Sequence, residues 1–139
     1  MEAAVVIGSG GRAIYWHLPE DRTSGSLPDG PGYPPSVRLW DFILENMDEV
    51  EGIAHSHPGG GVPGPSGTDL GTFVAVEKAL GRLDWWITSS EATVLIRWRG
   101  PGRADYAAVR LDEEPPWVAE LRAASGYGGP GARGVKLQT

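Results

Sequence analysis

The sequence predicts a mixed fold of helices and strands, in the α/β class and of the α+β type, folded as one domain. Its 139 residues match the size of a single domain of about 100–150 residues. Apolar residues make up 40% of the chain and six residues are tryptophans, which is typical of a protein with a buried core. Strand-like and helix-like segments follow one another in the order ββαβαβββα, and such runs of adjacent strands indicate a sheet with helices packed on it.

The first half of the chain contains a predicted hairpin, a helix and a strand. Residues 3–7 and 12–18 are β-forming runs on either side of a glycine-rich turn, as in two paired strands. In residues 36–47 the apolar side chains recur every three or four positions, which predicts an amphipathic helix with Ser36 as its N-cap. Residues 50–57 form a short strand-like run.

The second half continues with a helix, three strands and a last helix. Residues 68–80 have helical spacing, with Ser66 or Thr68 as the N-cap and a glycine directly after the last turn. Three runs rich in β-forming residues follow, and the chain then returns to helical spacing. The predicted strands are residues 83–87, 92–98 and 106–111, and the predicted helix is residues 115–124.

Glycine and proline are unusually frequent, with 21 and 12 residues, and they gather in three clusters. The clusters span residues 24–35, 58–67 and 126–134, and the sequence between them is typical of folded protein. We therefore expect a folded domain over residues 1–125 and a glycine-rich, disordered tail over residues 126–139.

The overall composition excludes several classes of protein. A net charge of −6 argues against a nucleic-acid-binding module, which normally has a basic face. Without cysteine the chain has no thiolate metal site, so zinc would need histidine and carboxylate ligands. The apolar run near the N-terminus is too short for a membrane span and lacks the basic residues of a signal peptide. We therefore predict a cytoplasmic protein without a membrane or nucleic-acid partner, and its oligomeric state is left open.

The residues that carry chemistry lie around the middle glycine cluster. His55 and His57 are two apart on a predicted strand, so both imidazoles are on one face with Cα atoms about 7 Å apart. Pro58 ends the strand, and Asp69 comes in the first turn of the next predicted helix. Two imidazoles, one carboxylate and an open position are the ligands of a catalytic zinc, although iron also uses two histidines and a carboxylate.

These residues resemble the signature of one metalloprotease family. His55-Ser-His-Pro58, seven residues, Ser66, two residues and Asp69 match the JAMM (MPN+, Mov34/PAD-1) pattern at every position and spacing. The match is local to residues 50–80 and extends loosely over residues 3–111. The resemblance implies an MPN-like fold of the cytidine-deaminase-like kind, in which helices flank a curved mixed sheet. It also implies a zinc-dependent hydrolase, an isopeptidase or deubiquitinase-like enzyme.

The resemblance also implies a role for each residue. His55, His57 and Asp69 would bind one zinc ion per chain, and Ser66 would stabilise the oxyanion of the tetrahedral intermediate. The family's general base is a glutamate at the start of the first strand. Glu2, which lies 53 residues before His55, matches this position best, and Glu20 is the alternative.

The expected substrate is a peptide or isopeptide bond at the C-terminal tail of a ubiquitin-like or sulfur-carrier protein. Trp85 and Trp86 are neighbours on a predicted strand, so one can be buried while the other is exposed to contact the substrate. Burial of both in the core is the favoured interpretation. The alternative function is a non-catalytic MPN-type scaffold, although members with that role generally lack the metal ligands that are present here.

Overall fold

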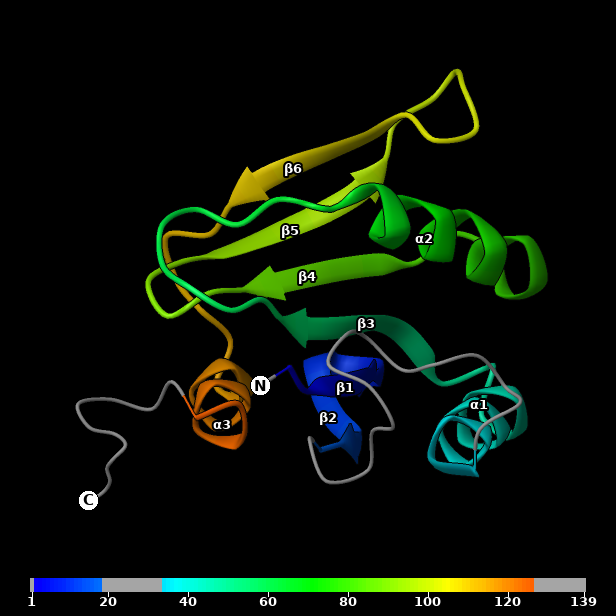
Figure 1. The fold of residues 1–139 in the computed structure, drawn as a ribbon. Helices are drawn as coiled ribbons and strands as arrows, with labels where there is room; N and C mark the ends of the chain where they lie inside the picture. The colour runs from blue at the N-terminus through cyan, green and yellow to red at the C-terminus, as the bar shows by residue number, and fades with distance from the viewer. Residues whose placement is uncertain (1, 19–33, 127–139) are drawn as a thin grey trace.

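The computed structural model describes residues 2–18 and 34–126, and within them the strands form one mixed sheet (Figure 1). The order of the strands across the sheet is β2-β1-β3-β4-β5-β6. The strands are β1 (Ala4–Gly8), β2 (Arg12–His17), β3 (Val50–Ser56), β4 (Asp84–Thr88), β5 (Thr93–Trp98) and β6 (Tyr106–Arg110). The α-helices are α1 (Pro34–Glu45), α2 (Gly67–Leu80) and α3 (Trp117–Ala124), and a short 3-10 turn, η1 (Ser9–Gly11), joins β1 to β2.

The predicted order of elements and the α+β class are confirmed. Only β3 and β4 pair in parallel, and the other neighbouring strands pair antiparallel. A parallel pair needs a crossover connection, and α2 provides it by running from the end of β3 back to the start of β4. The crossover therefore begins at the end of β3, where the two histidines lie.

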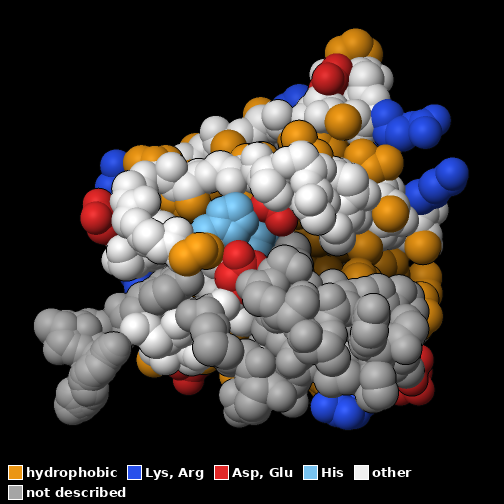
Figure 2. Space-filling model, in the orientation of Figure 1, with side chains coloured by type: hydrophobic (Ala, Val, Ile, Leu, Met, Phe, Trp, Pro, Cys, Tyr) orange, Lys and Arg blue, Asp and Glu red, His pale blue; other side chains and the backbone are white. Residues whose placement is uncertain are grey.

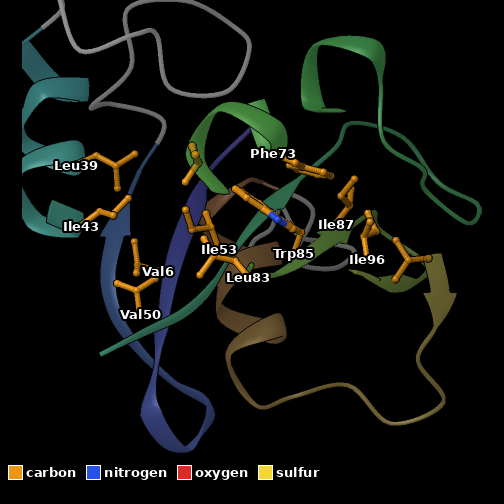
Figure 3. Close-up of a cluster of buried hydrophobic side chains, with 12 residues drawn as sticks. Val6, Leu39, Ile43, Val50, Ile53, Phe73, Leu83, Trp85, Ile87 and Ile96 are labelled. Atoms are coloured by element: carbon orange, nitrogen blue, oxygen red, sulfur yellow. The ribbon is translucent and has the colours of Figure 1, made fainter. Parts of the chain in front are cut away.

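Helices cover both faces of the sheet, and the side chains of β1 point alternately to one face and the other. Val6 belongs to a core cluster with Leu39 and Ile43 of α1 and with Phe73 of α2 (Figure 3). The neighbours of Val6 on β1 point to the other face, where they pack with Ala54 against α3. The α3 side of this second cluster consists of Trp117, Val118 and Leu121.

Several boundaries differ from the prediction. Helix α1 begins at Pro34 rather than with Ser36 as its N-cap, because proline is tolerated in the first turn of a helix. It ends at Glu45, and the Asn46 side chain donates a hydrogen bond to the Phe42 carbonyl, an acceptor in the last turn. Ser66 rather than Thr68 is the N-cap of α2.

Two of the predicted features lie outside the described residues. These are the first glycine and proline cluster up to residue 33 and the tail from residue 127 onward. Among the helices of the described segments, none has both the length and the apolar character needed to cross a bilayer.

Candidate metal centre

The end of β3 presents both histidines on one face of the sheet. His55 is the last residue but one of β3, and His57 follows the strand directly. The His57 amide donates a 2.9 Å hydrogen bond to the Thr88 carbonyl at the end of β4, which keeps the chain extended past the strand. The His55 side chain is 2% exposed and the His57 side chain is 22% exposed, so the pair lies where the protein interior meets the surface.

The start of α2 fixes the carboxylate. Ser66 Oγ accepts a 3.0 Å hydrogen bond from the Asp69 amide, and Asp69 Oδ2 accepts a 2.9 Å hydrogen bond from the Ser66 amide. This reciprocal capping box satisfies two of the free amides at the helix start. It also holds the Asp69 side chain, which is only 5% exposed, in one orientation toward β3.

The two imidazoles and the carboxylate converge on one point. His55 Nε2 lies 3.1 Å from His57 Nε2 and 3.4 Å from Asp69 Oδ1, and His57 Nε2 lies 3.0 Å from Asp69 Oδ2. Bonds of 2.0–2.1 Å in a tetrahedral zinc site put neighbouring ligand atoms about 3.3 Å apart. The three residues therefore have a spacing that could hold a metal ion, and Figure 2 shows the histidine atoms with Asp and Glu atoms beside them.

The charges in this group favour a cation. The pKa of His57 is raised, chiefly by its hydrogen bond with Asp69 and against the effect of burial, and the charges of Asp69 and Glu2 raise it further. Burial by itself would raise the pKa of Asp69. Hydrogen bonds from His55 and His57 outweigh burial, however, and hold that pKa well below its ordinary value. A metal ion would take the place of the proton that His57 shares with Asp69.

The structure brings Glu2 to the same face as the histidines. Ala4 pairs with His55 across β1 and β3, and the Ser56 amide donates a 3.0 Å hydrogen bond to the Ala3 carbonyl. Continuing this antiparallel register by two residues places Glu2 opposite His57, and directly opposed residues share a face of the sheet. Glu20, the alternative general base, lies outside the described residues.

The glycine-rich loop between His57 and Asp69 is held by the turn that follows β4. The Ser90 amide donates to the Gly59 carbonyl at 3.1 Å, and Ser89 Oγ donates to the Gly61 carbonyl at 2.6 Å. Gly59 and Gly61 have φ values of 94° and 76°, which side chains other than glycine rarely adopt. The two serines could not be found from the sequence, because no motif links them to a loop about 30 residues earlier in the chain.

The two tryptophans are both in the core. Trp85 is 2% exposed and stacks on Phe73, with 4.2 Å between the ring centroids, whereas Trp86 is 9% exposed and packs edge-on against Trp117. Neither is the half-exposed surface aromatic that strand alternation allowed. Trp85 does line a small cavity of about 30 Å³ whose wall includes His55.

A comparison of the chain with known proteins found no matching family model and no matching curated protein.

Proposed function

We propose that this protein is a zinc-dependent peptidase or isopeptidase of the JAMM type. One observation carries the proposal: His55, His57 and Asp69 converge with the spacing of zinc ligands. The identity and order of these residues, with Ser66 three positions before Asp69, match the family signature. The proposal includes an MPN-like form of the α+β fold.

Two histidines and one carboxylate fit either zinc or iron, and the order of the ligands with Pro58 and the spacing to Ser66, as in the family signature, favours zinc. The His57 side chain is 22% exposed, so a fourth ligand could approach the group from the surface. Zinc bound by two histidines and a carboxylate lowers the pKa of a water molecule toward about 7 and polarises a carbonyl group.

Glu2 is the proposed proton carrier. Its carboxylate lies on the face of the histidines, opposite His57, where it would accept a proton from the attacking water. The water oxygen then forms a bond to the carbonyl carbon, and the C–N bond breaks. Glu2 would deliver the proton to the leaving nitrogen, which gives a free amine and a carboxylic acid, and the acid then loses its proton to become a carboxylate.

Ser66 is the proposed donor to the oxyanion. Its Oγ accepts a hydrogen bond from the Asp69 amide. A serine hydroxyl has one proton and two lone pairs, so this bond leaves the proton available for a substrate oxygen. Ser66 is exposed at the start of α2, three residues before the ligand Asp69. A fixed donor of this kind stabilises the developing negative charge in the transition state.

The proposed substrate class is the C-terminal tail of a ubiquitin-like or sulfur-carrier protein, cleaved at a peptide or isopeptide bond in the cytoplasm. Such a tail is an extended chain, and the partly exposed site at the end of β3 can be approached by one. This substrate class rests on the resemblance to the family.

The first test measures zinc. Protein purified from zinc-supplemented medium should contain about one zinc per chain. Asp69→Asn should lose most of that zinc while keeping the capping geometry, because an amide oxygen can still accept the hydrogen bond from the Ser66 amide. Wild-type protein that binds no zinc in equilibrium dialysis would refute the proposal.

The second test measures cleavage. The protein is incubated with a panel of ubiquitin-like and sulfur-carrier fusions, and mass spectrometry identifies the bond that is cut. Glu2→Gln should retain zinc and lose cleavage, whereas the matched control Glu51→Gln, at an exposed carboxylate near the other end of β3, should leave cleavage unchanged. If zinc binds and no fusion is cut, the non-catalytic scaffold is the better description of the protein.

A further inference from the structure

We propose that helix α3 positions the Glu2 carboxylate from the opposite face of the sheet, and that Ser125, directly after this helix, is a positioning residue. The inference rests on the proposed role of Glu2 as proton carrier. It assigns a task in the reaction to a helix that packs on the face of the sheet away from α1 and α2.

A line of hydrogen bonds joins the end of α3 to the residue that follows Glu2. Ser125 Oγ lies 2.7 Å from Ser56 Oγ and 2.7 Å from the Leu121 carbonyl oxygen. Ser56 Oγ in turn accepts a 2.9 Å hydrogen bond from the Ala3 amide. Ala3, Ser56 and Ser125 are all buried, so water does not compete for these bonds.

Glu2 and Ala3 come before β1, which begins at Ala4. The hydrogen bonds at Ala3 therefore determine where Glu2 lies. The Ala3 amide donates to Ser56 Oγ, and the Ala3 carbonyl accepts from the Ser56 amide and lies 3.5 Å from Ser56 Oγ. Ser125 holds the Ser56 hydroxyl in the orientation that receives the Ala3 amide. Without Ser125 the Ser56 hydroxyl can rotate away, and the hydrogen bond that it accepts from the Ala3 amide is lost.

The same helix also supports the other side of the site. Arg122 of α3 donates a 2.9 Å hydrogen bond from Nε to the Ser89 carbonyl, and Ser89 Oγ holds the Gly61 carbonyl. Glu114 fixes the Arg122 guanidinium through two hydrogen bonds of 2.7 and 2.6 Å. Helix α3 is thus connected both to the chain beside Glu2 and to the loop between the metal ligands.

The experiment compares Ser125→Ala with a matched control, Tyr106→Phe. The control removes a hydrogen bond from the Tyr106 hydroxyl to the buried Glu77 carboxylate, near the end of α2. Hydrogen exchange of the Ala3 amide is measured by NMR in the metal-free protein. Zinc content, kcat and KM are measured on the fusion that the panel identifies. If Ser125→Ala does not fold, Ser125→Cys replaces it, since a thiol keeps the side-chain shape and is a weak hydrogen-bonding group.

In Ser125→Ala we expect exchange of the Ala3 amide to accelerate about tenfold, from the loss of one buried hydrogen bond. We expect kcat to fall about tenfold at unchanged KM and zinc content, because a small displacement of a catalytic group slows the chemical step. Tyr106→Phe should change neither. Unchanged Ala3 exchange, or an unchanged kcat where Glu2→Gln is inactive, would overturn the inference. Faster exchange combined with full activity in Glu2→Gln would instead refute the role proposed for Glu2.

Discussion

Ser66 offers the sharpest test of the site because its two roles can be separated by substitution. Its Oγ caps α2 by accepting a hydrogen bond from the Asp69 amide, and its hydroxyl is the proposed hydrogen-bond donor to the oxyanion. Ser66→Ala removes both. Ser66→Gly also removes the hydroxyl, but glycine is nearly as good an N-cap as serine, so this variant loses the donor with little loss of helix stability.

The magnitudes of the two effects differ enough to be distinguished. Loss of the cap in Ser66→Ala should lower the free energy of unfolding by about 0.5–1 kcal/mol, since the bond from the Ser66 amide to Asp69 Oδ2 remains. In Ser66→Gly the loss should be only a few tenths of a kcal/mol. Removal of an oxyanion donor costs about 3 kcal/mol in the transition state, which corresponds to a fall in kcat of about 100-fold or more.

The assay measures urea unfolding and zinc content for each variant, together with kcat and KM on the cleaved fusion. We expect both variants to lose kcat to the same extent and to differ in stability, while zinc content stays at the wild-type level. If Ser66→Gly keeps its kcat and only Ser66→Ala is impaired, Ser66 acts solely as a helix cap and the oxyanion role is wrong.

Three further predictions concern the candidate metal group and the packing of the sheet. The pKa of His57 is raised above its ordinary value of 6.5 in the metal-free protein. Protonated His57 therefore stabilises the fold at pH values below 6.5, and this stabilisation is lost as the pH rises through the raised pKa. Zinc must displace this proton, and zinc affinity measured by competition titration should therefore increase from about pH 6 to about pH 8; equal affinities would contradict the assignment. Glu77→Leu should lower the free energy of unfolding by about 2–4 kcal/mol in urea titrations, because the buried carboxylate accepts hydrogen bonds from Arg82, the Leu83 amide, Trp85 and Tyr106; a loss below about 0.5 kcal/mol would show that these donors find other partners. Gly52→Ala should destabilise the protein by about 3 kcal/mol or more, because a Cβ there would lie 2.0 Å from the Asp84 carbonyl oxygen. A stable variant with unchanged spectra would contradict this close approach of β3 to the paired strand β4.

Local pattern was sufficient to predict the order of the elements and the convergence of two histidines and an aspartate. The two histidines on β3 and the aspartate in the first turn of α2 follow from periodicity, capping residues and spacing, which are properties of neighbouring residues. The start of α1 could not be predicted in the same way, because Ser36 is a good N-cap and a good first-turn residue alike, and the prolines before it are also tolerated there.

What the sequence by itself determined is the order of the elements, the α+β class and the identity of the three converging residues. Only the tertiary structure decided what surrounds them: the pairing of β1 with β3 that brings Glu2 opposite His57, and the burial of both Trp85 and Trp86. It also decided the contact of Ser125 with Ser56 across 69 positions of the chain. The physical reason is the range of the interactions, because strand register and packing of a helix on a sheet depend on residues far apart in sequence, whereas caps and periodicity depend on residues within a few positions.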